Sequence, residues 1–167
     1  MIDLNERFLS IALGGIEVNE LAMLPKLELR VDTTCHNLQL IGEILSSLEF
    51  LKLNDSIIRN FMDIGTSFKN VRVLHIARCE LREVQGIRSF EQLEELYISY
   101  NQIDDLFDIS FLEYLNTLDF EGNSCVSPDQ LDYLKRMERL KDLNMKHNPV
   151  VRNYEYYPML EKKALNL

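Results

Sequence analysis

The sequence predicts an α/β solenoid, with short parallel strands stacked along one face and short helical turns along the other. Three observations predict it. Apolar residues recur in the same pattern at intervals of 22 to 25 residues. Within each interval two apolar residues alternate with outward-facing ones, as in a half-buried strand. A small or polar residue then follows, where the chain must turn out of the sheet.

The pattern is clearest in the stretch LEELYISYNQI, which begins at Leu93. Leu96 and Ile98 take the alternating strand positions, and Ile103 continues the apolar pattern beyond the strand. The amide of Asn101 can hydrogen-bond backbone groups that the turn leaves unpaired. This arrangement is the core of a leucine-rich repeat.

Six units fit the pattern in phase, and they begin at Leu24, Leu48, Val71, Leu93, Leu115 and Leu140. Their strand pairs are Leu27/Leu29, Leu51/Leu53, Leu74/Ile76, Leu96/Ile98, Leu118/Phe120 and Leu143/Met145. The turn positions hold Asp32, Ser56, Cys79, Asn101, Asn123 and Asn148. We therefore expect one leucine-rich repeat domain over residues 1–167, with six repeats in residues 24–147.

The rest of each unit must cross the convex side. In the third and fourth units apolar residues lie three apart, which predicts short 3₁₀ turns: Val84, Ile87 and Phe90, then Leu106, Ile109 and Leu112. In the longer last interval Pro128 precedes Leu131, Leu134 and Met137, which predicts a true helical turn or two.

Caps should cover the two apolar ends of the solenoid. Residues 1–23 are the expected N-terminal cap, with Asp3 as the N-cap of a helix that Gly14 and Gly15 end. Residues 148–167 contain an aromatic turn and are the expected C-terminal cap.

Composition excludes several classes of partner. The formal net charge of −9 argues against nucleic acid as an electrostatic partner. No run approaches the ~18 apolar residues of a membrane helix, and charged residues interrupt the place of a signal peptide. Cys35, Cys79 and Cys125 form no CxxC motif and fit reduced thiols. We expect a cytoplasmic protein with no membrane partner.

No enzyme motif is present. The chain has no glycine-rich phosphate loop, no HExxH and no GxSxG. His36, His75 and His147 lie in three different repeats without metal-ligand spacing. We therefore expect no catalytic residue, no cofactor, no metal and no small-molecule substrate.

The outward residues of the strands form the concave face. Parallel strands lie ~4.8 Å apart, so equivalent positions form ladders ~24 Å long across the six strands. Clustered aromatic residues on such a face are typical of protein interfaces. The candidate protein-binding residues are Phe50, Lys52, Asn54, Val73, His75, Arg78, Glu95, Tyr97, Ser99, Tyr100, Asp119, Glu121, Asp142 and Asn144. The alternative is a mixed, solvated face with no partner.

Several stretches resemble one family: VDTT from Val31, DIGTS from Asp63, ARC from Ala77, and SYN from Ser99. With the repeat scaffold around them, residues 21–150 look like leucine-rich repeat-containing protein 56. The resemblance implies a non-catalytic adaptor in the assembly of outer dynein arms or their transport into cilia and flagella. Its implied partners are outer arm dynein or intraflagellar transport components, and its implied location is the cytoplasm and the cilium or flagellum.

Two other repeat proteins remain alternatives. One is a phosphatase-regulatory subunit with similar 22-residue units, whose task would be to control an enzyme. The other is a ribonucleoprotein component of similar length, although the charge of −9 disfavours direct contact with RNA.

Overall fold

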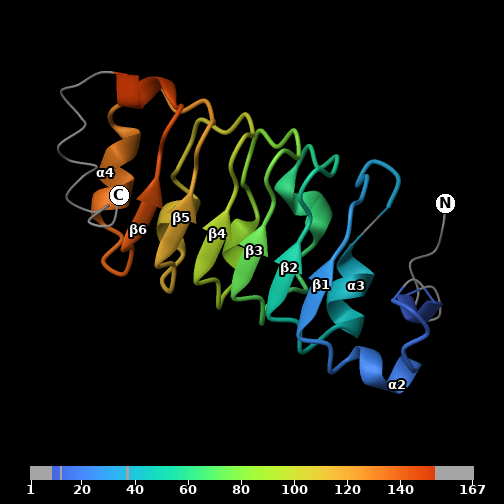
Figure 1. The fold of residues 1–167 in the computed structure, drawn as a ribbon. Coiled ribbons are helices and arrows are strands. Elements are labelled where there is room, and N and C mark those ends of the chain that lie inside the picture. The colour runs from blue at the N-terminus through green and yellow to red at the C-terminus, as the bar shows by residue number, and fades with distance from the viewer. Residues whose placement is uncertain (1–8, 12, 37, 153–167) are drawn as a thin grey trace.

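The computed structural model describes residues 9–11, 13–36 and 38–152. Six strands pair in parallel in chain order, so each repeat adds one strand beside the last (Figure 1). The strands are β1 (Lys26–Glu28), β2 (Phe50–Lys52), β3 (Val73–His75), β4 (Glu95–Tyr97), β5 (Thr117–Asp119) and β6 (Asp142–Asn144). The predicted leucine-rich repeat solenoid is confirmed.

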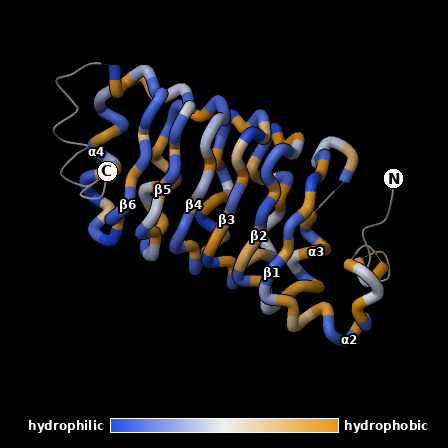
Figure 2. Tube along the Cα trace, viewed as in Figure 1, coloured by the Kyte–Doolittle hydropathy of each residue, from blue (hydrophilic) through white to orange (hydrophobic). Residues whose placement is uncertain are grey.

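Alternation of apolar and polar residues explains why each strand forms where it does. The middle residue of every strand is at most 5% exposed, because it points into the core: Leu27, Leu51, Leu74, Leu96, Leu118 and Leu143. Its two neighbours in each strand point the other way, as side chains alternate along a strand. Figure 2 shows the resulting alternation of apolar and polar residues along the coils.

Short helices return the chain along the convex side. The predicted 3₁₀ turns are η2 (Ile87–Ser89) and η3 (Ile109–Phe111), and the predicted helical turn is α4 (Gln130–Lys135). The earlier repeats carry two elements that the apolar spacing did not predict, namely α3 (Gln39–Ile44) and η1 (Phe61–Ile64).

The two ends are described in part. Residues 9–11 are helical. The chain then turns at Gly14 and Gly15, which both have positive φ, and the Gly15 amide donates to the Ser10 carbonyl at 2.8 Å. Helix α2 (Val18–Leu21) follows and buries Leu21. At the other end η4 (Pro149–Arg152) buries Val150. The expected N-cap Asp3 and most of the expected C-terminal cap lie outside the described residues.

A ladder of buried amides joins the coils on the side where the strands end. Asn101 Nδ2 donates to the carbonyls of Ile76, 2.8 Å, and Ile98, 3.0 Å, while its Oδ1 accepts the amides of Cys79 and Leu81. Asn123 and Asn148 repeat this pattern one and two coils later. Each asparagine thus ties its own coil to the preceding one, which holds the strands in register.

Candidate protein interface

The sheet brings the predicted concave residues into ladders. The register pairs Lys52 with His75, His75 with Tyr97, and Tyr97 with Asp119, so these side chains are immediate neighbours across the strands. A second outward-facing ladder, two residues earlier in each strand, contains Phe50, Val73, Glu95, Thr117 and Asp142. The geometry of the face is thus as expected, and its role in binding stays a prediction.

A stacked row crosses the first four strands. The Lys26 ammonium lies 4.6 Å from the Phe50 ring centroid, and the Phe50 and His75 ring centroids are 5.2 Å apart. His75 then stacks on Tyr97 with centroids 4.2 Å apart and planes inclined by 10°. Phe50, His75 and Tyr97 are half-buried as a result. The row is therefore an ordered surface rather than a set of independent exposed rings.

The Tyr97 hydroxyl ends this row with an acidic contact. It donates to Glu95 Oε2 at 2.8 Å. Burial, and after it the hydrogen bond to Glu95, raises the pKa of Tyr97 to about 12. The phenol therefore stays protonated and continues to donate at every pH at which the protein would act.

Each of two carboxylates at the N-terminal end of the face is paired with two cations. Glu28 pairs with Lys26 at 2.7 Å and with Lys52 at 3.1 Å. Asp55 pairs with Arg78 at 2.6 Å and with Arg30 at 3.7 Å. The hydrogen bond from Lys26 lowers the pKa of Glu28, and the hydrogen bond from Arg78 lowers that of Asp55.

Carboxylates at the C-terminal end are held by neutral donors instead. Glu121 accepts the Tyr100 hydroxyl at 2.6 Å and Asn144 Nδ2 at 2.9 Å. Asn144 Nδ2 also donates to Asp119 Oδ1 at 2.9 Å. The hydrogen bond from Tyr100 is the main cause of a lowered pKa at Glu121. Within the described chain, the one basic side chain within 4 Å of the Glu121 carboxylate is His147, whose Nε2 lies 3.5 Å from Oε1 and forms an ion pair only when the imidazole is protonated.

A left-handed backbone conformation, which the apolar pattern did not predict, sets the direction of several side chains. The residue before the turn position has a positive φ of 55° to 67° in repeats two to six: Asp55, Arg78, Tyr100, Gly122 and His147. Only one of these is a glycine, so repeat geometry overrides local preference. The signal available in the sequence was Gly122, the glycine at this position in the fifth repeat.

Three predicted site residues contribute less free surface than expected. Ser99 is 7% exposed, because the extended alternation ends with the strand at Tyr97. Asn54 uses its Oδ1 to accept the Ala77 amide at 2.8 Å, so it fastens neighbouring coils. Val73 is half-buried. Tyr100, by contrast, is 50% exposed and offers the largest aromatic surface on this face.

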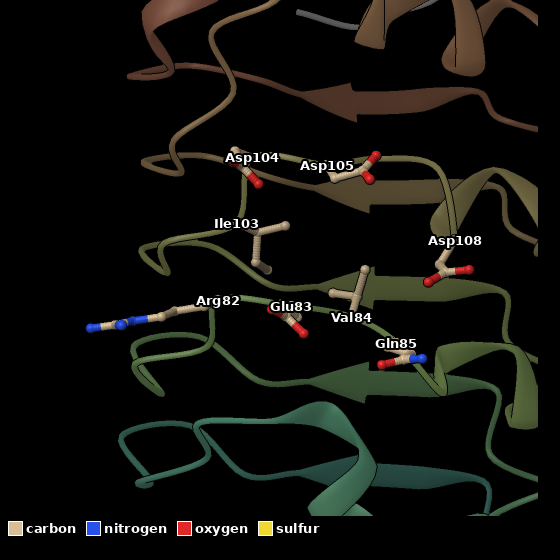
Figure 3. A pocket seen from close by; sticks show the side chains of 8 residues that line it. All are labelled: Arg82, Glu83, Val84, Gln85, Ile103, Asp104, Asp105 and Asp108. Atoms are coloured by element: carbon tan, nitrogen blue, oxygen red, sulfur yellow. The ribbon is translucent and has the colours of Figure 1, made fainter.

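A hollow lies away from the sheet face, beside the turns that follow β3 and β4 (Figure 3). It measures about 320 Å³, and its lining is Arg82, Glu83, Val84, Gln85, Ile103, Asp104, Asp105 and Asp108. Asp108 is paired with Arg88 at 2.7 Å, and Asp105 accepts the Phe107 amide at 2.8 Å. These carboxylates therefore already serve the local fold.

Sites of two other classes are absent from the described part of the chain. None of its groups of histidine, cysteine and acidic side chains is arranged to hold a metal ion. None of its helices has the length and apolar character needed to cross a membrane.

Known proteins share this repeat region. A mouse protein named leucine-rich repeat-containing protein 56 is 42% identical over 134 residues, which cover 80% of this chain. The repeat region belongs to the leucine-rich repeat-containing protein 56 family. A homolog from Trypanosoma brucei brucei is 35% identical over 113 residues, or 66% of the chain. The chain spans about a quarter of the mouse relative, 24%, and 15% of the trypanosome one.

More distant similarities extend beyond this family. An Arabidopsis thaliana homolog of a protein phosphatase 1 regulatory inhibitor subunit is 28% identical over 134 residues, covering 77% of this chain and 40% of its own. A solved leucine-rich repeat protein of Leptospira interrogans superposes with a TM-score of 0.66 at 24% identity, over 78% of this chain and 33% of its own, which supports the fold alone. No protein-family model matches the chain.

Proposed function

We propose that this chain is a non-catalytic adaptor that binds a protein segment on its concave face during assembly of outer dynein arms or their transport into cilia and flagella. Membership of the leucine-rich repeat-containing protein 56 family supports the adaptor role. The proposed partners are outer arm dynein or intraflagellar transport components, and the proposed location is the cytoplasm and the cilium or flagellum.

The observation that carries the proposal is the stacked row of Phe50, His75 and Tyr97 with Tyr100 beside it. Large aromatic side chains contribute most of the binding energy in many interfaces. Because stacking already orders these rings, a partner would lose little further side-chain entropy on binding them.

Proximity labelling in cells that build motile cilia tests the proposal. Wild-type chain should label outer dynein arm or transport proteins. In the double variant Tyr97→Ala, Tyr100→Asn, labelling of these proteins should fall roughly tenfold or more. Truncating a central aromatic residue costs about 2 kcal/mol or more of binding free energy. Asparagine suits position 100 because it tolerates the positive φ there.

The matched control is Tyr114→Ala. Tyr114 is 38% exposed, lies outside the concave ladders and packs beneath Arg139. This substitution therefore removes a similar aromatic ring from a different part of the surface. Labelling of the same proteins by the double variant would overturn the concave face as the binding site. Absence of dynein arm and transport proteins from the wild-type sample would overturn the assembly role.

A second candidate is control of a phosphatase, which the 28% identity to the Arabidopsis regulatory subunit homolog favours. The same labelling distinguishes the two functions. A phosphatase catalytic subunit enriched by wild type and lost in the double variant would favour the second candidate.

A further inference from the structure

The concave face is divided into two halves of opposite charge. Over β1–β3 and the residues that follow each strand, four cations face two anions: Lys26, Arg30, Lys52 and Arg78 against Glu28 and Asp55. Over β4–β6 the charged residues are Glu95, Asp119, Glu121, Asp142 and Lys146, beside His147. The face is therefore electrostatically polar along the solenoid.

The two halves also differ in how far their charges are compensated. Every cation of the first half has an anion within 4 Å, as described above. In the second half none of the four carboxylates has a lysine or arginine within 4 Å among the described residues. Asp142 is exposed, and its carboxylate has no hydrogen bond or ion pair in that part of the chain.

The aromatic row ends inside this negative half. Tyr97 lies between Glu95 on its own strand and Asp119 on the next, and Tyr100 lies against Glu121. Beyond the effects of burial and of the Glu95 hydrogen bond, Asp119 and Asp142 add to the raised pKa of Tyr97. An apolar platform and an uncompensated negative field thus meet at β4.

We propose that the β4–β6 half of the concave face binds a basic segment of the protein partner, with lysine or arginine over the carboxylates and a neighbouring apolar side chain against Tyr97 and His75. This inference rests on the proposed adaptor function and names the chemistry of its partner. Complementary charge supplies specificity and steers association. An acidic segment or a nucleic acid would meet repulsion at four positions.

The spacing of the strands bounds the length of this segment. Two strand intervals separate β4 from β6, or ~10 Å, and an extended chain covers ~3.3 Å per residue. The basic stretch therefore needs about three or four residues. The positive half of the face orients the bound segment, because the cations over β1–β3 favour the acidic or neutral end of that segment.

Selection from a random twelve-residue peptide library displayed on phage tests the inference with the whole chain as bait. Enriched peptides should carry lysine or arginine next to an apolar residue. Their affinity should fall about five- to tenfold for the double variant Glu95→Gln, Asp142→Asn, and should fall steeply with salt. Glutamine keeps an acceptor for the Tyr97 hydroxyl, so the variant tests charge rather than packing.

The matched control is the double variant Asp104→Asn, Glu113→Gln, which removes the same charge at two exposed positions outside the concave face. Equal weakening in both variants would show general attraction to an acidic protein and would overturn the inference. Enrichment of peptides without excess basic residues, or no enrichment, would also overturn it. Either failure leaves the proposed function standing if proximity labelling still depends on Tyr97 and Tyr100.

Discussion

The imidazole of His75 stacks on the phenol of Tyr97, with ring centroids 4.2 Å apart and planes inclined by only 10°. Burial, and after it the positive charge of Lys52, lowers the pKa of His75 below its usual 6.5. Glu95 and Glu28 act in the opposite direction but do not cancel this effect. The folded protein therefore favours neutral imidazole at the centre of the aromatic row.

A pH dependence of stability follows from this lowered pKa. Below about pH 6.5 the unfolded chain protonates His75 more readily than the folded chain does, so the free energy of unfolding should decrease as pH falls. Above that pH both states hold neutral imidazole, and His75 contributes no slope. Between pH 7.5 and pH 5.5 the urea concentration at the midpoint of unfolding should fall less in His75→Gln than in wild type. Equal losses would contradict the pKa assignment.

The choice of pH window keeps two carboxylates of the concave face out of this comparison. Hydrogen bonds from Lys26 and Tyr100 lower the pKa values of Glu28 and Glu121 respectively from their usual 4.5. Those carboxylates therefore lose their contribution to stability only at more acidic pH. Any difference between wild type and His75→Gln above pH 5 reports on the imidazole.

Replacing Asn101 by alanine should lower the free energy of unfolding by about 3 kcal/mol, because buried backbone groups would lose their hydrogen-bond partners. Its Oδ1 accepts the Cys79 and Leu81 amides, and its Nδ2 donates to the Ile76 carbonyl. Urea denaturation measures the loss. Asn19→Ala, at an exposed asparagine of α2, should change the free energy of unfolding by no more than about 0.5 kcal/mol. Similar losses in both variants would argue against the amide ladder.

Gly122→Ala should displace the ring of Tyr100. A Cβ at position 122 would lie 2.6 Å from Tyr100 Cδ1, and φ there is +67°. We expect a loss of about 1 kcal/mol in unfolding free energy. A double-mutant cycle with Tyr100→Asn should return a coupling of at least about 0.5 kcal/mol, since the clash disappears with the ring. Additive effects would mean that Tyr100 does not pack on Gly122.

The three thiols should differ sharply in reactivity. Burial raises the pKa of Cys79 and of Cys125 to about 11 in each case, while Cys35 is exposed. At pH 8 a disulfide reagent should modify Cys35 rapidly, and the other two only after unfolding, because the thiolate is the reactive form. Mass spectrometry of peptides assigns the sites. Rapid modification of Cys79 in the native protein would contradict its burial.

The strands were predictable because burial on one side of a short strand demands alternation. Leu96 between Glu95 and Tyr97 is 0% exposed, and the equivalent leucines in the other repeats behave alike. The short 3₁₀ turns were predictable for the same reason, since Ile87 and Ile109 each stand at the centre of three buried apolar residues spaced by three. Helix α3 was missed because six residues give too little periodicity to recognise.

Part of the candidate interface was also predictable. Alternation placed Tyr97 and Asp119 on the outer face, and the sheet register then made them neighbours. It failed for Ser99, which lies beyond the strand, where side chains no longer alternate, and is 7% exposed. It could not foresee that Tyr100 takes a positive φ, because local preference disfavours that conformation and only the stacking of coils imposes it.

The repeat length, the strand positions and the order of charges along the concave face follow from the chain alone, since each depends on which residue stands at a fixed place in a repeating pattern. The folded structure decided which charges are compensated and which rings are stacked. Arg78 reaches Asp55, whereas Glu121 is left to Tyr100 and Asn144. These outcomes depend on side-chain directions and distances of a few ångströms between different coils, which no single repeat encodes.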